Sequence, residues 1–133
     1  PYKAAKLLSK QLQKGVMDKD IKTLRFLAQA WTTAKENEKA IPVLQQAADL
    51  SSDGNMDARL AEVLLNLEKW DDAIKAAKAA QKKGDLDNPG NINVALGMAY
   101  FNKKQFDQAI IEFKKAKKQK KVEKRANQWL KYL

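Results

Sequence analysis

The stretch that decides the fold is NVALGMAYFNKKQFDQAIIEFKKA, residues 93–116. Its apolar residues recur at helical spacing in two groups, with the polar segment 102–105 between them. This pattern predicts two antiparallel helices joined by a short turn. Small residues at Gly97 and Ala109 allow the helices to approach closely, and the rings of Tyr100 and Phe113 fill the space beside them.

The same pattern occurs twice more upstream. LRFLAQAWTTAKENEKAIPVLQQA begins at Leu24, and DARLAEVLLNLEKWDDAIKAAKAA begins at Asp57. The small residue that opens the second helix falls at Ala40, Ala73 and Ala109, so the units are offset by 33 and 36 residues. A repeat of this length indicates an array of helical hairpins, and we expect these alanines to be buried between paired helices.

The ends of the chain extend the pattern. AAKLLSKQLQKG near the start aligns with AIKAAKAAQKKG of the second unit, so we expect residue 1 to begin inside a repeat that continues upstream. The partner of this first helix would be missing, which predicts self-association through the helix. The predicted organisation is a single all-α domain over 1–133, an α-solenoid of about eight helices: 1–19 (orphan second helix), 21–53, 54–89 and 90–121 (repeats), and 122–133 (capping helix).

Composition excludes most catalytic chemistry. The chain has 133 residues with no histidine and no cysteine, so it lacks the usual zinc ligands, the imidazole acid or base, and a cysteine nucleophile. We predict no enzyme activity, no catalytic residue, no cofactor and no bound metal. A mean hydropathy of −0.62 predicts no membrane span.

The connection between residues 85 and 91 has a weak likeness to a calcium loop, because Asp85 and Asp87 are followed by Gly90. A calcium loop also needs a bidentate glutamate at its twelfth position, where Leu96 stands. A turn between two hairpins is therefore the better interpretation. The three tryptophans lie on apolar helix faces, which favours a role in the core.

The best candidate site is the concave groove that the first helices of stacked hairpins would form. Its polar and apolar lining suits an extended peptide or a partner helix, with amides pairing to backbone groups. Glu62 would oppose an acidic ligand. The predicted groove residues are Lys22, Arg25, Gln29, Asn55, Glu62, Asn66, Val94, Met98 and Asn102.

A basic run near the C-terminus is the alternative site. It carries +7 of the formal net charge of +10. Such a patch could follow a phosphate backbone or an anionic membrane surface, although a solvated helix face explains it more simply. The excess of 23 lysines over 3 arginines and the lack of aromatic residues in the run argue against nucleic acid. The patch comprises Lys114, Lys115, Lys117, Lys118, Lys120, Lys121, Lys124 and Arg125.

These repeats resemble the tetratricopeptide family, whose pattern runs W-x2-L-G-x2-Y, Ala, Phe, Ala, Pro. The third unit matches through Leu96-Gly97, Tyr100, Ala109, Phe113 and Ala116. The closing proline is absent from all three units, where Ser52, Asp85 and Lys121 stand. The resemblance implies a helical scaffold that binds other proteins.

A more specific resemblance rests on LAQAW, EKAIPVLQQAA, AxxAxKKG and the terminal QWLKYL. These segments look like the C-terminal part of the tetratricopeptide proteins that accompany ExbB-ExbD-TonB systems in Gram-negative bacteria. This resemblance implies a periplasmic accessory of a TonB-type energy-transducing complex, with components of that complex as partners. A cytoplasmic location is the alternative.

Overall fold

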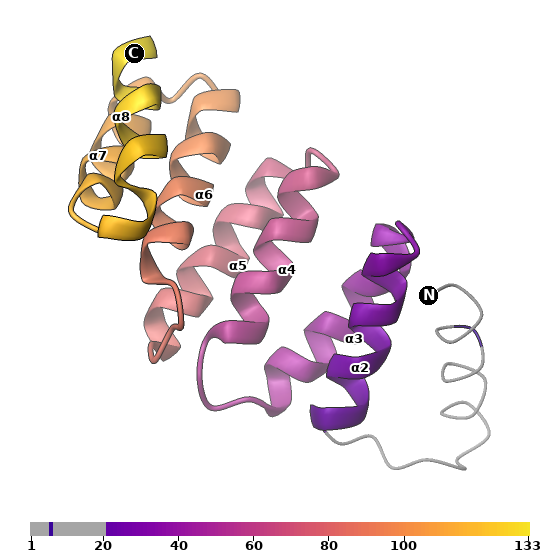
Figure 1. Cartoon of the computed structure of the whole chain (residues 1–133). Coiled ribbons are helices and arrows are strands. Elements are labelled where there is room, and N and C mark those ends of the chain that lie inside the picture. Colours follow the sequence, from indigo (N-terminus) through magenta and orange to yellow (C-terminus); the bar gives the residue numbers. More distant parts are fainter. Residues whose placement is uncertain (1–5, 7–20) are drawn as a thin grey trace. The chain divides into compact units, whose positions relative to one another are not determined.

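The computed structural model describes Lys6 and residues 21–133, and its described residues are helical with no strand (Figure 1). Except for Lys6, the predicted orphan helix 1–19 lies outside the described residues, as does the self-association expected through it. The described part holds seven α-helices and one 3-10 helix: α2 (Ile21–Thr33), α3 (Asn37–Leu50), α4 (Asn55–Asn66), α5 (Trp70–Lys83), α6 (Pro89–Asn102), α7 (Phe106–Lys117), η1 (Lys120–Val122) and α8 (Glu123–Tyr132).

The chain divides into two compact units, residues 1–52 and residues 53–133. In the first unit, α2 packs against α3 as a hairpin. Leu24 and Leu27 on α2 and Leu44 on α3 are buried, as the spacing of apolar residues predicts. Trp31 is also buried, and the ammonium of Lys39 lies 4.8 Å from the centre of its ring.

The second unit contains the hairpins α4–α5 and α6–α7, with α5 packed on α6 and α8 packed on α7. The small residues lie where the helices approach most closely. Ala73 and Ala109 are 3% and 0% exposed, and Ala40 of the first unit is 0% exposed. These values confirm the burial expected from the alignment of the repeats. The all-α fold of antiparallel hairpins is therefore the one that the sequence predicts.

All three hairpins turn in the same way. Lys35, Glu68 and Lys104 follow the first helix of each hairpin and have φ values of 62°, 60° and 62°. In each turn the next residue donates its backbone N–H to a carbonyl five residues earlier, at 2.9 Å in every case. This is the bonding of a Schellman motif, which ends a helix by satisfying its last carbonyls. The three residues are 33 and 36 positions apart, so the turns repeat with the helices.

The start of α4 is fixed to the end of α5 by several contacts. Gly54 donates its N–H to the Gly84 carbonyl at 3.0 Å, and a Cβ added at Gly54 would lie 2.2 Å from the Ala80 carbonyl oxygen. Asp57, which is 4% exposed, pairs with the ammonium of Lys83 at 2.8 Å. These contacts explain why a glycine and a carboxylate are needed at the entry to this repeat.

Candidate partner-binding surfaces

Three exposed polar side chains and one half-buried methionine line one face of α4 and α6 in the second unit. Glu62 and Asn66 lie one turn apart on α4, and Met98 and Asn102 occupy the equivalent positions of the next repeat on α6. The two helices contact each other. Asn102 donates its side-chain N–H to the Met98 carbonyl at 2.8 Å, which holds that amide against its own helix. These four predicted groove residues therefore lie on the first helices of two neighbouring hairpins.

Glu62 connects this face to α8. Although the Glu62 side chain is exposed overall, surrounding protein atoms partly desolvate its carboxylate and raise its pKa above the ordinary value of 4.5, while the guanidinium groups of Arg59 and Arg125 lower it. Because Arg125 belongs to α8 and its charge acts on Glu62, α8 borders the same face. We call this surface the α4–α6–α8 face and define it by Arg59, Glu62, Asn66, Met98, Asn102 and Arg125.

Two residues of the second unit that the sequence analysis placed in the groove are instead engaged by the protein itself. Val94 is 1% exposed, so its side chain supports the helix packing and is not available to a partner. The side-chain oxygen of Asn55 accepts a hydrogen bond from the Asp87 N–H at 3.0 Å, which ties the start of α4 to the loop before α6. Both residues stabilise the scaffold beneath or beside the face.

The remaining groove residues lie on α2 in the first unit. Lys22, Arg25 and Gln29 are exposed and follow one another at helical spacing, so they share a face of that helix. Gln29 donates from its side-chain nitrogen to the Thr33 hydroxyl at 3.2 Å. This face of α2 presents two cations to solvent.

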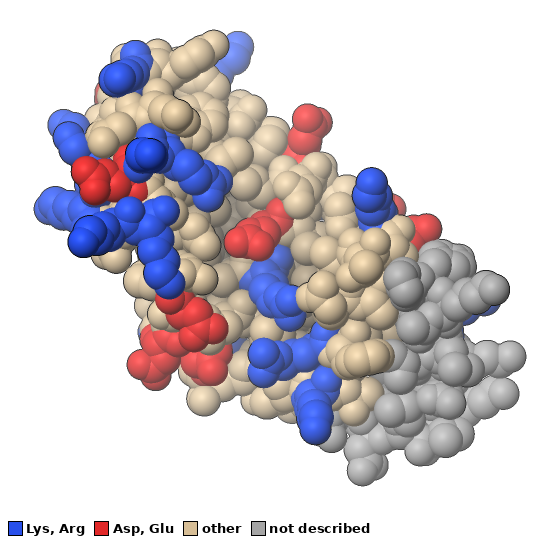
Figure 2. All heavy atoms as spheres, in the orientation of Figure 1, with Lys and Arg blue, Asp and Glu red and all other residues tan. Residues whose placement is uncertain are grey.

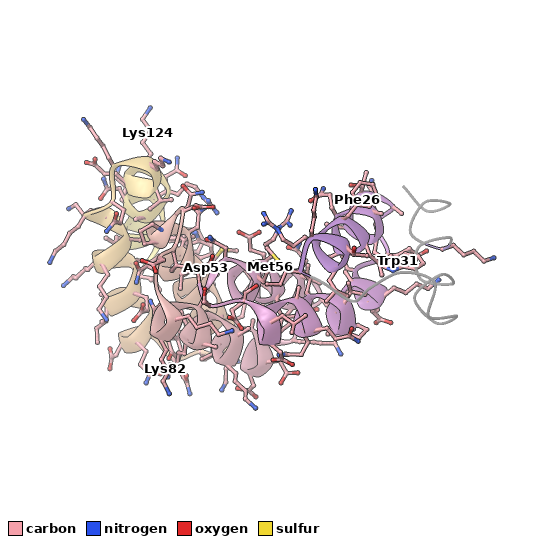
Figure 3. All side chains as sticks on the ribbon, turned by 90° about the horizontal axis from the view of Figure 1, so that it is seen from below. Phe26, Trp31, Asp53, Met56, Lys82 and Lys124 are labelled. Carbon is pink, nitrogen blue, oxygen red and sulfur yellow. The ribbon has the colours of Figure 1, made fainter. Side chains whose placement is uncertain are left out.

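The basic patch spans the end of α7, η1 and the start of α8, and all eight of its residues are exposed. Figure 2 shows the blue side chains gathered over this end of the second unit, and Figure 3 shows Lys124 at its surface. Two of its lysines contact other side chains of the protein: Lys121 donates to the Asn88 side-chain oxygen at 3.1 Å, and Lys115 pairs with Glu112 at 3.5 Å. The patch is thus largely solvated.

Sequence reasoning missed an aromatic hollow between α6 and α8. Its lining consists of Phe101, Gln128, Trp129 and Tyr132. The expectation that Trp129 packs in the core holds only in part, because this residue is half-buried. The available signal was the spacing of Gln128, Trp129 and Tyr132, which places all three on neighbouring faces of one short helix.

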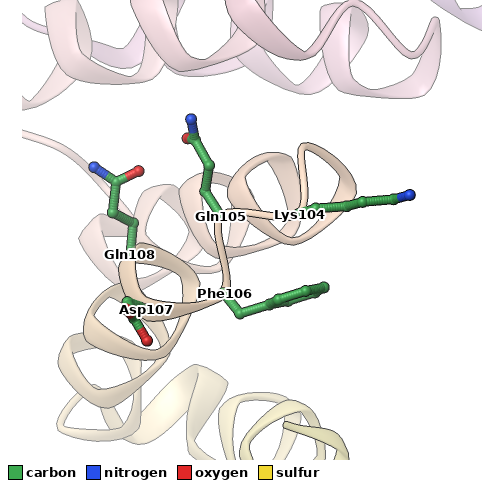
Figure 4. Close-up of a pocket in the computed structure, with 5 residues that line it drawn as sticks. All are labelled: Lys104, Gln105, Phe106, Asp107 and Gln108. Carbon is green, nitrogen blue, oxygen red and sulfur yellow. The ribbon is translucent and has the colours of Figure 1, made fainter.

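A further hollow lies at the turn between α6 and α7, lined by residues 104–108. Figure 4 shows that its side chains do not converge on a common point: the ring of Phe106 and the carboxylate of Asp107 point in different directions. It therefore offers no arrangement of groups for catalysis or for binding a charged ligand.

Across Lys6 and residues 21–133, no cluster of three or more acidic side chains is placed to hold a metal ion. The loop that resembled a calcium site contains Asp85 at φ 51°, directly after Gly84 at φ 75°. Among the same residues, no helix has the length and apolar character needed to span a membrane.

The class of protein follows from the repeats, the buried alanines and the shared turns. Residues 59–122 match the tetratricopeptide repeat family model. Over this stretch the chain is similar to tetratricopeptide repeat proteins, and the fold of such repeats typically serves as a non-enzymatic interaction scaffold. No curated protein matches the chain.

Several MamA proteins are among the solved structures that resemble this chain. The MamA RS-1 ArsTM double mutant superposes with a TM-score of 0.82 at 20% identity, over 99% of this chain and 72% of that one. A MamA protein crystal structure superposes with a TM-score of 0.74 at 26% identity, over 94% of this chain and 67% of that one. A MamA AMB-1 structure gives 0.75 at 24% identity over 88% of this chain, which spans only 62% of that chain. These likenesses show the fold.

Proposed function

We propose that this chain is a non-catalytic scaffold that binds a peptide segment or a helix of a partner protein on the α4–α6–α8 face. The observation that carries the proposal is the pairing of repeat-equivalent, accessible side chains on adjacent helices: Glu62 with Met98, and Asn66 with Asn102. A rigid surface that repeats its side-chain positions from helix to helix suits an elongated ligand.

The chemistry of the face is mixed. The amides of Asn66 and Asn102 can pair with backbone groups of a ligand, and Met98 offers an adaptable apolar contact. Arg59 and Arg125 favour acidic side chains in the ligand, whereas Glu62 disfavours them nearby. A ligand is therefore expected to place its acidic residues toward Arg125 and away from Glu62.

The test is partner capture with matched variants. The chain carrying Asn66→Ala and Asn102→Ala should lose most of a captured partner, because two hydrogen-bonding positions are removed without disturbing the core. The control carries Gln45→Ala and Gln81→Ala, two exposed glutamines on the second helices α3 and α5. Equal capture by both double variants would show that the face is not the binding surface.

The more specific proposal is that the scaffold assists a TonB-type energy-transducing complex in the periplasm. It rests on the sequence resemblance at LAQAW, EKAIPVLQQAA and QWLKYL, and the comparisons add no support to it. Capture from a Gram-negative envelope fraction tests it. Recovery of ExbB, ExbD or TonB components, lost in the Asn66 and Asn102 double variant, would support the role; their absence from the captured material would reject it.

The second candidate function is binding of nucleic acid or an anionic surface through the basic patch. Its supporting observation is the exposure of eight cations on one stretch of α7, η1 and α8. Titration with duplex DNA and with anionic vesicles at physiological salt tests it. Binding that falls steeply with salt, and that disappears when Lys118, Lys120, Lys121 and Lys124 are changed to glutamine, would favour this candidate over the scaffold.

A further inference from the structure

Phe101 is the centre of an aromatic cluster at the end of the second unit. Its ring meets the rings of Phe106, Trp129 and Tyr132 edge to face, at centroid distances of 5.6, 5.2 and 6.3 Å. Trp129 also stacks on Phe113 with a centroid distance of 5.1 Å and an interplanar angle of 8°. Since Phe113 is fully buried, the cluster is anchored in the core and its inner walls are rigid.

The outer side of this cluster is open. Tyr132 is 82% exposed although its ring belongs to the cluster, and Gln128 is exposed beside it. The hollow between Phe101, Gln128, Trp129 and Tyr132 thus has aromatic walls and one amide at its rim. Aromatic walls with few polar groups are typical of pockets that take an apolar side chain.

The charges around the hollow favour an acidic ligand. The helix that supplies three of the four lining residues, α8, carries Lys124, Arg125 and Lys131 against Glu123, a formal charge of +2. Arg125 lies one turn before Trp129 on α8, and Lys131 adjoins Tyr132. In α8 the only acid is Glu123, at the end of the helix away from the hollow. A ligand that brings carboxylates next to its apolar group would complement this setting.

We propose that the hollow of Phe101, Gln128, Trp129 and Tyr132 is an anchor pocket for one bulky apolar side chain in an acidic segment of a partner protein. The segment places an acidic residue toward Arg125 and continues along the α4–α6–α8 face. This inference rests on the proposed function and names the class of ligand. We expect the aromatic hollow to supply most of the binding free energy, because well-packed aromatic pockets concentrate affinity.

The probe is a fluorescein-labelled peptide in which one central phenylalanine is flanked on both sides by glutamates. Binding to the full chain is followed by fluorescence anisotropy at low salt. Two control peptides have alanine at the centre, or glutamine in place of every glutamate. The pocket variant is Tyr132→Ala, which removes a side chain that is 82% exposed and should not unfold the chain. The matched control is Ile111→Ala, an apolar residue on α7 that is 52% exposed outside the hollow.

We expect the phenylalanine peptide to bind at least about tenfold more tightly than either control peptide. Tyr132→Ala should weaken its binding by about tenfold, and Ile111→Ala should leave it unchanged. Equal binding of the phenylalanine and alanine peptides, or no binding of the first, would overturn the anchor pocket. So would reversible dimerisation that Tyr132→Ala abolishes, since a second copy would then be the occupant. If partner capture still depends on Asn66 and Asn102, the proposed scaffold function stands even though the anchor pocket is rejected.

Discussion

The ring of Phe113 occupies the space that a side chain at Gly97 would need. A Cβ added at Gly97 would lie 2.6 Å from both Cε1 and Cζ of that ring. The ring cannot easily move aside, because Phe113 is 0% exposed and stacks on Trp129. The glycine in the middle of α6 is therefore required by helix packing, even though glycine disfavours a helix interior.

Gly97→Ala should destabilise the chain. Helix propensity alone would stabilise the variant by about 1 kcal/mol, but overpacking against Phe113 is expected to cost about 1–3 kcal/mol. Urea unfolding measures the difference. Adding Phe113→Leu should lessen the penalty of Gly97→Ala relative to a Phe113→Leu background, because the two side chains share one space. A raised unfolding midpoint in Gly97→Ala would contradict the close approach of α6 and α7.

Ala109→Leu tests the second half of the same contact. Ala109 is 0% exposed, so the larger side chain should destabilise by about 1–3 kcal/mol through overpacking. The control is Gln108→Leu, the preceding residue of α7, which is exposed and should change stability by less than about 0.5 kcal/mol. Equal melting midpoints for the two variants would mean that the repeat register is wrong.

The ion pair between Asp57 and Lys83 should matter more than a surface pair. Lys83→Met leaves the 4%-exposed Asp57 without its cation and should destabilise by about 1–3 kcal/mol, since the lysine itself is partly solvated. Adding Asp57→Asn should recover part of that loss, because the remaining buried group is then neutral. Chemical denaturation of the four forms gives the coupling energy, and strict additivity would contradict the pairing.

Glu62 should make stability depend on pH in a defined direction. Its pKa is raised in the folded state, so folding favours the protonated form. The stability that this adds is fully present below the unfolded value of about 4.5 and is lost as pH rises through the folded pKa. Glu62→Gln should therefore be more stable than the parent at neutral pH and equal to it near pH 3.5.

Denaturation curves at the two pH values, with Glu68→Gln as the control, check this expectation. Glu68 lies in the turn after α4, is exposed, and is not one of the residues that define the α4–α6–α8 face. A Glu62→Gln variant that is less stable than the parent at neutral pH would show that Arg59 and Arg125 outweigh the burial of the carboxylate.

The candidate surfaces were only partly predictable. Glu62, Asn66, Met98 and Asn102 follow from the repeat register, because equivalent positions on equivalent helices point the same way. The surroundings of Val94 and Asn55 do not follow from it. Val94 is buried by its neighbours, and Asn55 bonds to Asp87, which is 32 residues away in sequence. Such contacts depend on how the second helix of one hairpin meets the first helix of the next.

The conformation of the turns was also not predictable from the sequence. Lys35, Glu68 and Lys104 take a left-handed conformation that sequence reasoning reserves for glycine or asparagine. Nothing in the side chains of lysine or glutamate signals it. The energetic cost of this conformation is offset by the Schellman hydrogen bonds and by the packing of the two helices that each turn joins.

The sequence by itself determined the helices, the hairpins and the alanines at their centres, because apolar spacing and residue size are local properties that repeat along the chain. Only the tertiary structure decided that Phe101, Trp129 and Tyr132 form a hollow. These rings come from α6 and α8, and their common surface exists only once α7 holds the two helices together. The spacing within one helix shows which residues share a side, but the openness of that side depends on what packs against it.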